Sequence, residues 1–82
     1  MKVILSGEAK KQYGRLNEPM LGRITDALDD LEKEPPKGDI KRLSGRPGVF
    51  RVQVGGYRIL YVVRENHIRI EKIAPRGQAY KE

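Results

Sequence analysis

Arginines in the second half of the chain could stabilise negative charge that develops on a phosphate during cleavage of a phosphodiester. Arg58 follows a Gly-Gly pair, and Arg76 lies close to the end of the sequence. Attack by the ribose 2′-hydroxyl adds negative charge to the phosphate, and a guanidinium offers a permanent charge and a fork of donors that match phosphate oxygens. When preorganised, each arginine contributes on the order of 3 kcal/mol to such a transition state. Arg58 and Arg76 are therefore candidate charge-stabilising groups.

The proton transfers of this reaction need a different kind of side chain. Arginine is a poor acid or base because its pKa lies above about 12. Tyr80, Lys81, Lys72 and groups of the substrate are the alternatives, and the sequence leaves them open. His67 is the sole histidine and lies beside a predicted turn, so a surface role is expected for it. Chemistry that uses a pair of histidines is excluded.

Metal-dependent chemistry is not indicated by the cysteine or acidic residues. The chain has no cysteine, which removes thiolate chemistry and the common structural zinc sites. Asp26, Asp29 and Asp30 are spaced so that they lie on the outer surface of a helix, where they form a solvated face. The acids of the second half are scattered without a shared motif. We predict no metal and no cofactor.

A β-hairpin is predicted around Gly55-Gly56, because alternating apolar and polar residues flank two glycines that tolerate the positive φ of a tight turn. With this turn, Val54 faces Tyr57 and Gln53 faces Arg58. Side-chain alternation then places Arg51, Gln53 and Arg58 on one face of the sheet. The other face carries the apolar residues expected to pack against helices, which are Phe50, Val52, Val54, Tyr57, Ile59 and Tyr61.

A second turn is predicted at Glu65-Asn66, and it extends the sheet by one strand. The residue pairs expected across these two strands are Arg64 with His67, Val62 with Arg69, Leu60 with Glu71 and Arg58 with Ile73. The chain then returns to the Gly55-Gly56 end, so we expect Arg76 to lie within reach of Arg58 in a cationic pocket. Tyr80 follows four residues later, where it could stack on a base, supply a hydroxyl or anchor the C-terminus.

The first half of the chain is predicted to form the scaffold. A strand over residues 3–5 leads into a helix that Ser6 caps and that runs to about Leu16. Pro19 starts a second helix, and Pro35-Pro36 ends it. Its inward apolar stripe consists of Leu21, Ile24, Leu28 and Leu31. The predicted fold is α+β, with a short N-terminal strand and a two-helix hairpin packed on an antiparallel sheet of about four strands, in a single domain over residues 1–82.

Positive charge is concentrated in the second half. Residues 1–36 carry six Lys and Arg against seven Asp and Glu, whereas residues 37–82 carry eleven against four. Such a field attracts polyanions without distinguishing RNA from DNA, a membrane surface or an acidic partner. Lys41, Arg42 and Arg46 of the linker at 37–48 are further candidate phosphate contacts. The N-terminal apolar run is too short for a signal peptide, and no stretch reaches membrane-spanning length, so a cytoplasmic protein is expected.

These motifs and their order resemble the RelE branch of the RelE/ParE toxin superfamily over nearly the whole chain. The residues that carry the resemblance are Leu43-Ser44-Gly45, the run Tyr57-Arg58-Ile59-Leu60-Tyr61 after the Gly-Gly turn, and Pro75-Arg76-Gly77 with Tyr80. The resemblance implies the toxin of a type II toxin-antitoxin system, a metal-independent, ribosome-dependent endoribonuclease that cleaves messenger RNA in the A site and inhibits translation. It implies messenger RNA, the ribosome and a cognate antitoxin as partners, with a monomeric toxin inside a hetero-oligomer.

The resemblance also assigns roles to single residues. The implied catalytic residues are Arg58, Arg76 and Tyr80, and the expected RNA-binding residues are Arg51, Gln53, Lys41, Arg42, Arg46 and Lys81. Gln53 stands where several active relatives have a second basic residue, and the tail carries fewer basic groups than theirs, two departures consistent with reduced activity. The main alternative is a ParE-like toxin, which shares the fold and inhibits DNA gyrase by binding without nuclease activity. A third possibility is a basic domain that only binds RNA or an antitoxin. The joint presence of the arginines and Tyr80 favours the nuclease.

Overall fold

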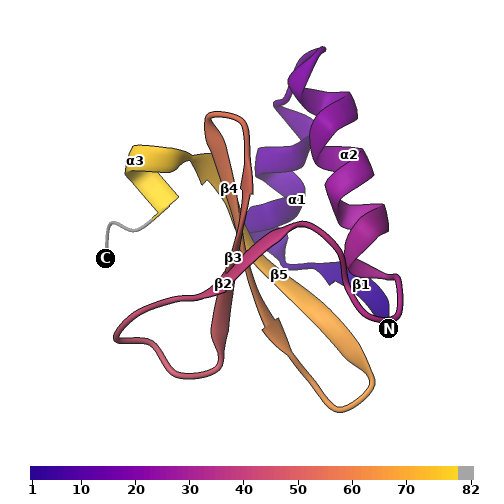
Figure 1. The fold of residues 1–82 in the computed structure, drawn as a ribbon. Helices are drawn as coiled ribbons and strands as arrows, with labels where there is room; N and C mark the ends of the chain where they lie inside the picture. Colours follow the sequence, from indigo (N-terminus) through magenta and orange to yellow (C-terminus); the bar gives the residue numbers. More distant parts are fainter. Residues whose placement is uncertain (80–82) are drawn as a thin grey trace.

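The computed structural model describes residues 1–79 and contains a sheet, two long helices and one short helix (Figure 1). The elements in chain order are β1 (Lys2–Leu5), α1 (Gly7–Gly14), α2 (Met20–Leu31), β2 (Asp39–Arg42), β3 (Val49–Val54), β4 (Tyr57–Val63), β5 (His67–Pro75) and α3 (Arg76–Ala79). None of the helices in this part of the chain has the length and apolar character needed to cross a membrane.

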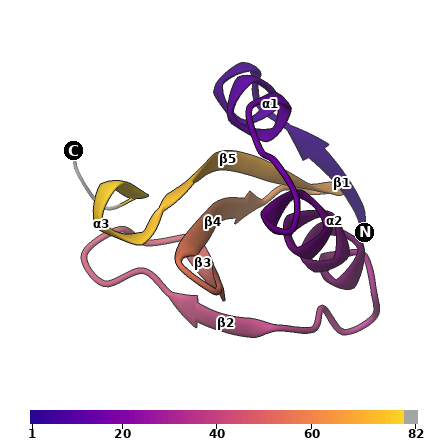
Figure 2. The ribbon, with the colours of Figure 1, turned by 90° about the horizontal axis from the view of Figure 1, so that it is seen from above.

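The five strands form one sheet in the order β1-β5-β4-β3-β2. β1 runs parallel to β5, and the other neighbours are antiparallel. α1 and α2 both lie on one side of β3 and β4, and α3 lies on the other side (Figure 1). Seen from above, α3 and α2 are again on opposite sides of β4 (Figure 2). The α+β fold predicted from the sequence is therefore confirmed, with a mixed sheet of five strands where about four antiparallel strands were expected.

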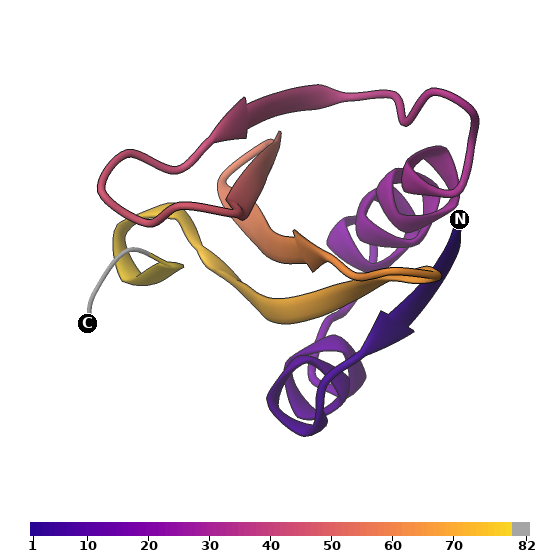
Figure 3. The same cartoon turned by 90° about the horizontal axis from the view of Figure 1, so that it is seen from below.

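The additional strand, β2, lies in the segment that was predicted to be a linker. β2 pairs with β3 only and forms one edge of the sheet, as the view from below also shows (Figure 3). Three of its four residues are charged, and only Ile40 packs against the core. Charged residues are typical of edge strands because they discourage further pairing. A strand with one apolar residue has no readable alternation, which is why the sequence pattern did not reveal it.

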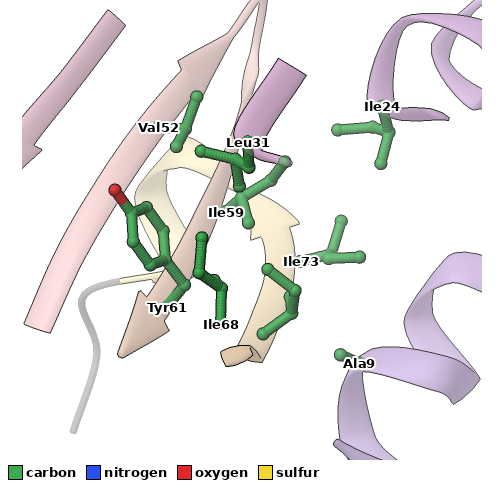
Figure 4. Close-up of a cluster of buried hydrophobic side chains, with 9 residues drawn as sticks. Ala9, Ile24, Leu31, Val52, Ile59, Tyr61, Ile68 and Ile73 are labelled. Atoms are coloured by element: carbon green, nitrogen blue, oxygen red, sulfur yellow. The ribbon is translucent and has the colours of Figure 1, made fainter. Parts of the chain in front are cut away.

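The hydrophobic core lies between the two long helices and the sheet (Figure 4). Of the predicted α2 stripe, Ile24 and Leu31 are fully buried and Leu28 packs against them, whereas Leu21 lies outside the core cluster. α2 ends at Leu31, before Pro35-Pro36 is reached. The remaining core side chains are Ala9, Val52, Ile59, Tyr61, Ile68, Ile70 and Ile73.

The hairpin at Gly55-Gly56 has the predicted register, with Gln53 opposite Arg58 and Arg51 opposite Leu60. Gly55 has a φ of 57°, the left-handed conformation that favours glycine. Phe50 faces Tyr61 across the same two strands, and their rings stack with centroids 5.3 Å apart. The Arg42 guanidinium lies 5.8 Å from the Phe50 ring centroid, a cation-π contact from the edge strand.

The pairing of β4 with β5 departs from the predicted register at one point. Tyr61 faces Ile70, but Leu60 faces Lys72, so Glu71 is an additional residue on β5 and forms a β-bulge. The predicted pair Val62–Arg69 is confirmed, because it lies between the turn and the bulge. The predictions of Leu60 with Glu71 and Arg58 with Ile73 were wrong by one residue. The bulge lets Ile70 and Ile73 both face the core, where each is essentially fully buried.

Ser6 and Gln12, at the start of α1 and within it, make hydrogen bonds to β5 next to this bulge. Ser6 caps α1 as predicted, since its hydroxyl accepts from the Ala9 amide at 3.0 Å. The same hydroxyl donates to the Glu71 carbonyl at 3.0 Å. Further along α1, the side-chain oxygen Oε1 of Gln12 accepts from the Ile73 amide at 2.6 Å. These bonds hold β5 against the start of α1 and α1 itself at Glu71 and at Ile73.

Candidate functional site

Three arginines meet on the face of the sheet that the two long helices leave uncovered. Arg51 and Arg58 project from β3 and β4, and Arg76 begins α3 directly after β5. The Arg76 amide donates to the Gly56 carbonyl at 2.8 Å, which brings the start of α3 to the hairpin turn as predicted. Burial lowers the pKa of Arg58 from its ordinary value, and the charges of Arg51 and Arg76 lower it further. The predicted cationic cluster is therefore present.

An open cavity of about 810 Å³ lies beside this cluster. The residues that line it are Lys41, Arg42, Leu43, Ser44, Gly45, Arg46, Arg51 and Arg58. Its outer wall is the β2–β3 loop, which hydrogen bonds between Leu43 and Val49 and between Arg46 and Leu43 hold closed. The three linker cations predicted as phosphate contacts all line this cavity. A polyanion would meet five positive side chains here, and guanidinium and ammonium groups are suited to binding phosphates.

Arg51 is held at the site by Asp39, and its side chain is 12% exposed. Its Nη1 donates to the Asp39 backbone carbonyl at 3.2 Å and lies 3.7 Å from the Asp39 carboxylate. Asp39 also acts on Arg58, because its negative charge partly offsets the lowering of the Arg58 pKa. This role was not predicted from the sequence, because Asp39 was expected to lie in a loop. Only the pairing of β2 with β3 brings it to the site.

Gln53 lies on the same face as the arginines, but its side chain turns away from the cavity. Its amide nitrogen donates to the Gly55 carbonyl in a very short contact. Gln53 therefore braces the hairpin turn in this structure. Lys72 lies opposite Leu60, which in turn lies opposite Arg51, so Lys72 shares the face of the cluster.

Two of the predicted site residues, Tyr80 and Lys81, lie outside the described residues. His67 stands beside the Glu65-Asn66 turn, with its Nδ1 2.9 Å from the Asn66 side-chain oxygen. That turn closes the end of the sheet opposite to Gly55-Gly56, so His67 is remote from the arginines. Across residues 1–79, no group of three or more acidic or histidine side chains is arranged to hold a metal ion.

A two-helix layer on a small twisted sheet, with arginines converging on the open face, defines the class of small toxins from type II toxin-antitoxin systems. The chain belongs to the family of ParE toxins of type II toxin-antitoxin systems, which matches residues 3–80. It is 39% identical over 66 residues to a protein of Methanocaldococcus jannaschii named toxin RelE1, a match that covers 74% of this chain and 73% of that protein.

Solved structures agree with this assignment. A chain of the archaeal RelE-RelB complex from Pyrococcus horikoshii is 30% identical, with a TM-score of 0.75, and the match covers 94% of this chain and 96% of that one. The isolated Escherichia coli RelE toxin has the same fold, with a TM-score of 0.76 at 18% identity, over 96% of this chain and 89% of that one. The predicted resemblance to the RelE branch is confirmed.

Proposed function

We propose that this toxin is a ribosome-dependent endoribonuclease that cleaves messenger RNA in the A site and thereby inhibits translation. The observation that carries the proposal is the convergence of Arg51, Arg58 and Arg76 at a cavity lined by further cations. A permanent positive charge from several sides is what a phosphate needs when it gains negative charge in the transition state. The similarity to proteins named RelE supports the same reaction.

The three arginines have distinct parts in this proposal. Arg51 is held by Asp39 and is suited to binding a phosphate in the ground state. Arg58 and Arg76 project from β4 and from the first residue of α3, so they can contact one phosphate from two directions. Partial removal of Arg58 from water strengthens its interaction with a developing negative charge. The arginines thus take the charge-stabilising part that a metal has in other nucleases.

The proton transfers are assigned to groups other than the arginines. Lys72 on the cluster face is one candidate. Tyr80 and Lys81 are the others on this chain, and ribosomal or substrate groups complete the set. A phenol or ammonium group can serve only if its pKa is shifted toward neutrality at the site.

A cognate antitoxin is the proposed inhibitor. The similar Pyrococcus horikoshii chain was solved as a RelE-RelB complex. Acidic residues of a segment that folds on binding would complement the five cations of the cavity and would compete with RNA for Arg51 and Arg58. We propose a monomeric toxin held in a hetero-oligomer with this antitoxin, in the cytoplasm.

A second candidate function is inhibition of DNA gyrase by binding. The description of the matched family as ParE toxins favours it. A binding inhibitor does not need arginines that converge on one phosphate, so the geometry of the cluster favours the nuclease.

Toeprinting of a defined message on translating ribosomes tests the proposal. The purified toxin is expected to cut within the A-site codon, and Arg58→Ala and Arg76→Ala are each expected to reduce cutting by about a hundredfold or more. Arg64→Ala is the matched control, because Arg64 lies at the opposite end of the sheet and its loss removes the same charge. Intact message together with loss of gyrase supercoiling would overturn the proposal in favour of the second candidate.

A further inference from the structure

The tip of the β3–β4 hairpin is bordered by a cation from α2. A Cβ built on Gly55 would lie 2.9 Å from Nη1 of Arg23 and 3.1 Å from its Cζ and Nη2. Any side chain at Gly55 would therefore displace the guanidinium from this position. The absence of a side chain at this position allows Arg23 to rest directly against the turn, and the same turn accepts the hydrogen bond from the Arg76 amide.

A second cation reaches the same end of the molecule from α1. Arg15 follows the last residue of α1 and lines a hollow of about 210 Å³ together with Tyr57 and Pro75. Tyr57 follows the Gly55-Gly56 turn, and Pro75 directly precedes Arg76. Figure 1 shows the hairpin turn, the connection between α1 and α2, and α3 at the same end of the molecule. The C-cap of α1 and the first turn of α2 thus each place one arginine near the tip of the β3–β4 hairpin.

Neither arginine has the bonding that a structural role would require. Both side chains are exposed, and within residues 1–79 neither of them makes an ion pair or a hydrogen bond. Arg23 is the sole basic residue of α2, whose acids Asp26, Asp29 and Asp30 follow it along the helix. The helix therefore places its one positive charge at the end that borders the site.

We propose that Arg15 and Arg23 form a second phosphate-binding pair, which holds the RNA backbone next to the phosphate that Arg58 and Arg76 contact. This inference rests on the proposed function. Exposed guanidinium groups without a carboxylate partner are free to bind phosphodiester oxygens. An RNA strand that leaves the cavity across the hairpin tip would pass from Arg76 to these two side chains. The phosphodiesters belong either to the message itself or to the ribosomal RNA around it.

The test measures binding without cleavage. Ribosomes are programmed with a message that carries a 2′-deoxyribose at the cut position, and the Kd of the toxin is measured over a series of salt concentrations. The variant Arg15→Gln/Arg23→Gln is expected to bind about tenfold more weakly. The slope of log Kd against the logarithm of the salt concentration is expected to fall by about 1.4, because each phosphate contact with a single strand contributes about 0.7 to this slope. Cleavage of a normal message at saturating toxin is expected to keep its rate.

Two further variants separate charge from structure. Lys2→Gln/Arg64→Gln removes two charges at the opposite end of the sheet and is expected to change the Kd less than about twofold. Arg15→Lys/Arg23→Lys keeps the charges and is expected to restore most of the binding. If the control variant weakens binding as much, or if the Gln variant binds like the wild type, the pair has no such role.

Methylphosphonate substitution at single positions of the message identifies the source of the phosphates. If a neutral linkage at one position removes the difference between wild type and variant, the pair binds the message. If the difference persists at every message position, the pair binds ribosomal RNA, which also supports the inference. Wild-type toxin that does not bind programmed ribosomes at all would overturn both the proposed function and this inference, whereas binding that is unaffected by the variant overturns the inference alone.

Discussion

Arg58 on β4 lies directly opposite Ala74 on β5, and Arg76 follows two residues later. This pairing exists because Glu71 forms a bulge upstream of it. Without the bulge, Arg58 would face Ile73, and the side chains of β5 beyond that point would exchange faces. Ile73 would then leave the core, and Arg76 would lie one residue further along β4 relative to Arg58. The bulge therefore couples the packing of the core to the position of the tail arginine.

Gln12 is expected to be essential for this part of the sheet. Gln12→Leu removes the acceptor of the Ile73 amide, and an unsatisfied buried donor costs about 1–3 kcal/mol of the free energy of unfolding. Urea denaturation measures this loss, with Lys11→Leu as a control at an exposed position of the same helix. Hydrogen exchange should show faster exchange of the Ile73 amide in the Gln12 variant. An unchanged exchange rate would mean that the bond is not formed in solution.

Ser6→Ala removes both bonds of the Ser6 hydroxyl, one to the Ala9 amide and one to the Glu71 carbonyl. Loss of an N-cap serine costs about 0.5–2 kcal/mol, and the bulge contact adds to this value. Ser6→Thr retains a hydroxyl and is expected to keep most of the stability. Gly7→Ala serves as the control, because a Cβ at Gly7 would meet no atom within 4 Å. A Ser6→Ala protein as stable as the wild type would contradict the double role of this hydroxyl.

Local signals in the sequence were sufficient to predict the hairpin at Gly55-Gly56 and the cap of α1 at Ser6. The Gly55-Gly56 turn fixes the register of its strands through neighbouring residues, so no distant contact is needed to read it. The bulge was missed, yet it leaves a trace. The apolar residues Ile68, Ile70 and Ile73 are spaced by two and then by three, and the longer step marks the additional residue at Glu71.

The contact between Asp39 and Arg51 could not have been predicted in this way. It depends on an edge strand with almost no apolar pattern and on a pairing between segments that the β2–β3 loop separates. The positions of Arg15 and Arg23 beside the hairpin tip depend on how the helices dock on the sheet. Such docking follows from packing of the whole core, which periodicity along one element does not contain.

Tyr61 is predicted to make the stability of the protein pH-dependent at the alkaline end. Burial raises the pKa of its phenol above the ordinary value of about 10, so the folded state holds this proton more tightly than the unfolded chain. Its contribution to stability is therefore fully present below pH of about 10 and is lost as the pH rises through the folded pKa. Urea denaturation over this range should show a steeper decline for the wild type than for Tyr61→Phe. Equal declines would show that the phenol ionises normally.

Asp39→Asn tests how the site balances its charges. The variant keeps the backbone carbonyl that binds Arg51 and removes a carboxylate from the cationic cavity. The carboxylate is 58% exposed, so stability should change by less than about 1 kcal/mol. Affinity for RNA is expected to increase about two- to fivefold because the local potential becomes more positive. Asp26→Asn, the same charge change on the exposed face of α2, should leave affinity nearly unaltered, and an equal gain there would attribute the effect to net charge alone.

Arg58 is expected to act through the shape of its guanidinium as well as through its charge. Arg58→Lys keeps a cation opposite Ala74 but loses the fork of donors that can bind two phosphate oxygens at once. Single-turnover cleavage on programmed ribosomes should therefore fall by about tenfold or more in the Lys variant and by about a hundredfold or more in Arg58→Gln. Arg64→Lys provides the control for the same exchange away from the site. If the Lys variant cleaves at the wild-type rate, charge alone is sufficient, and the paired geometry of Arg58 and Arg76 has no part in stabilising the transition state.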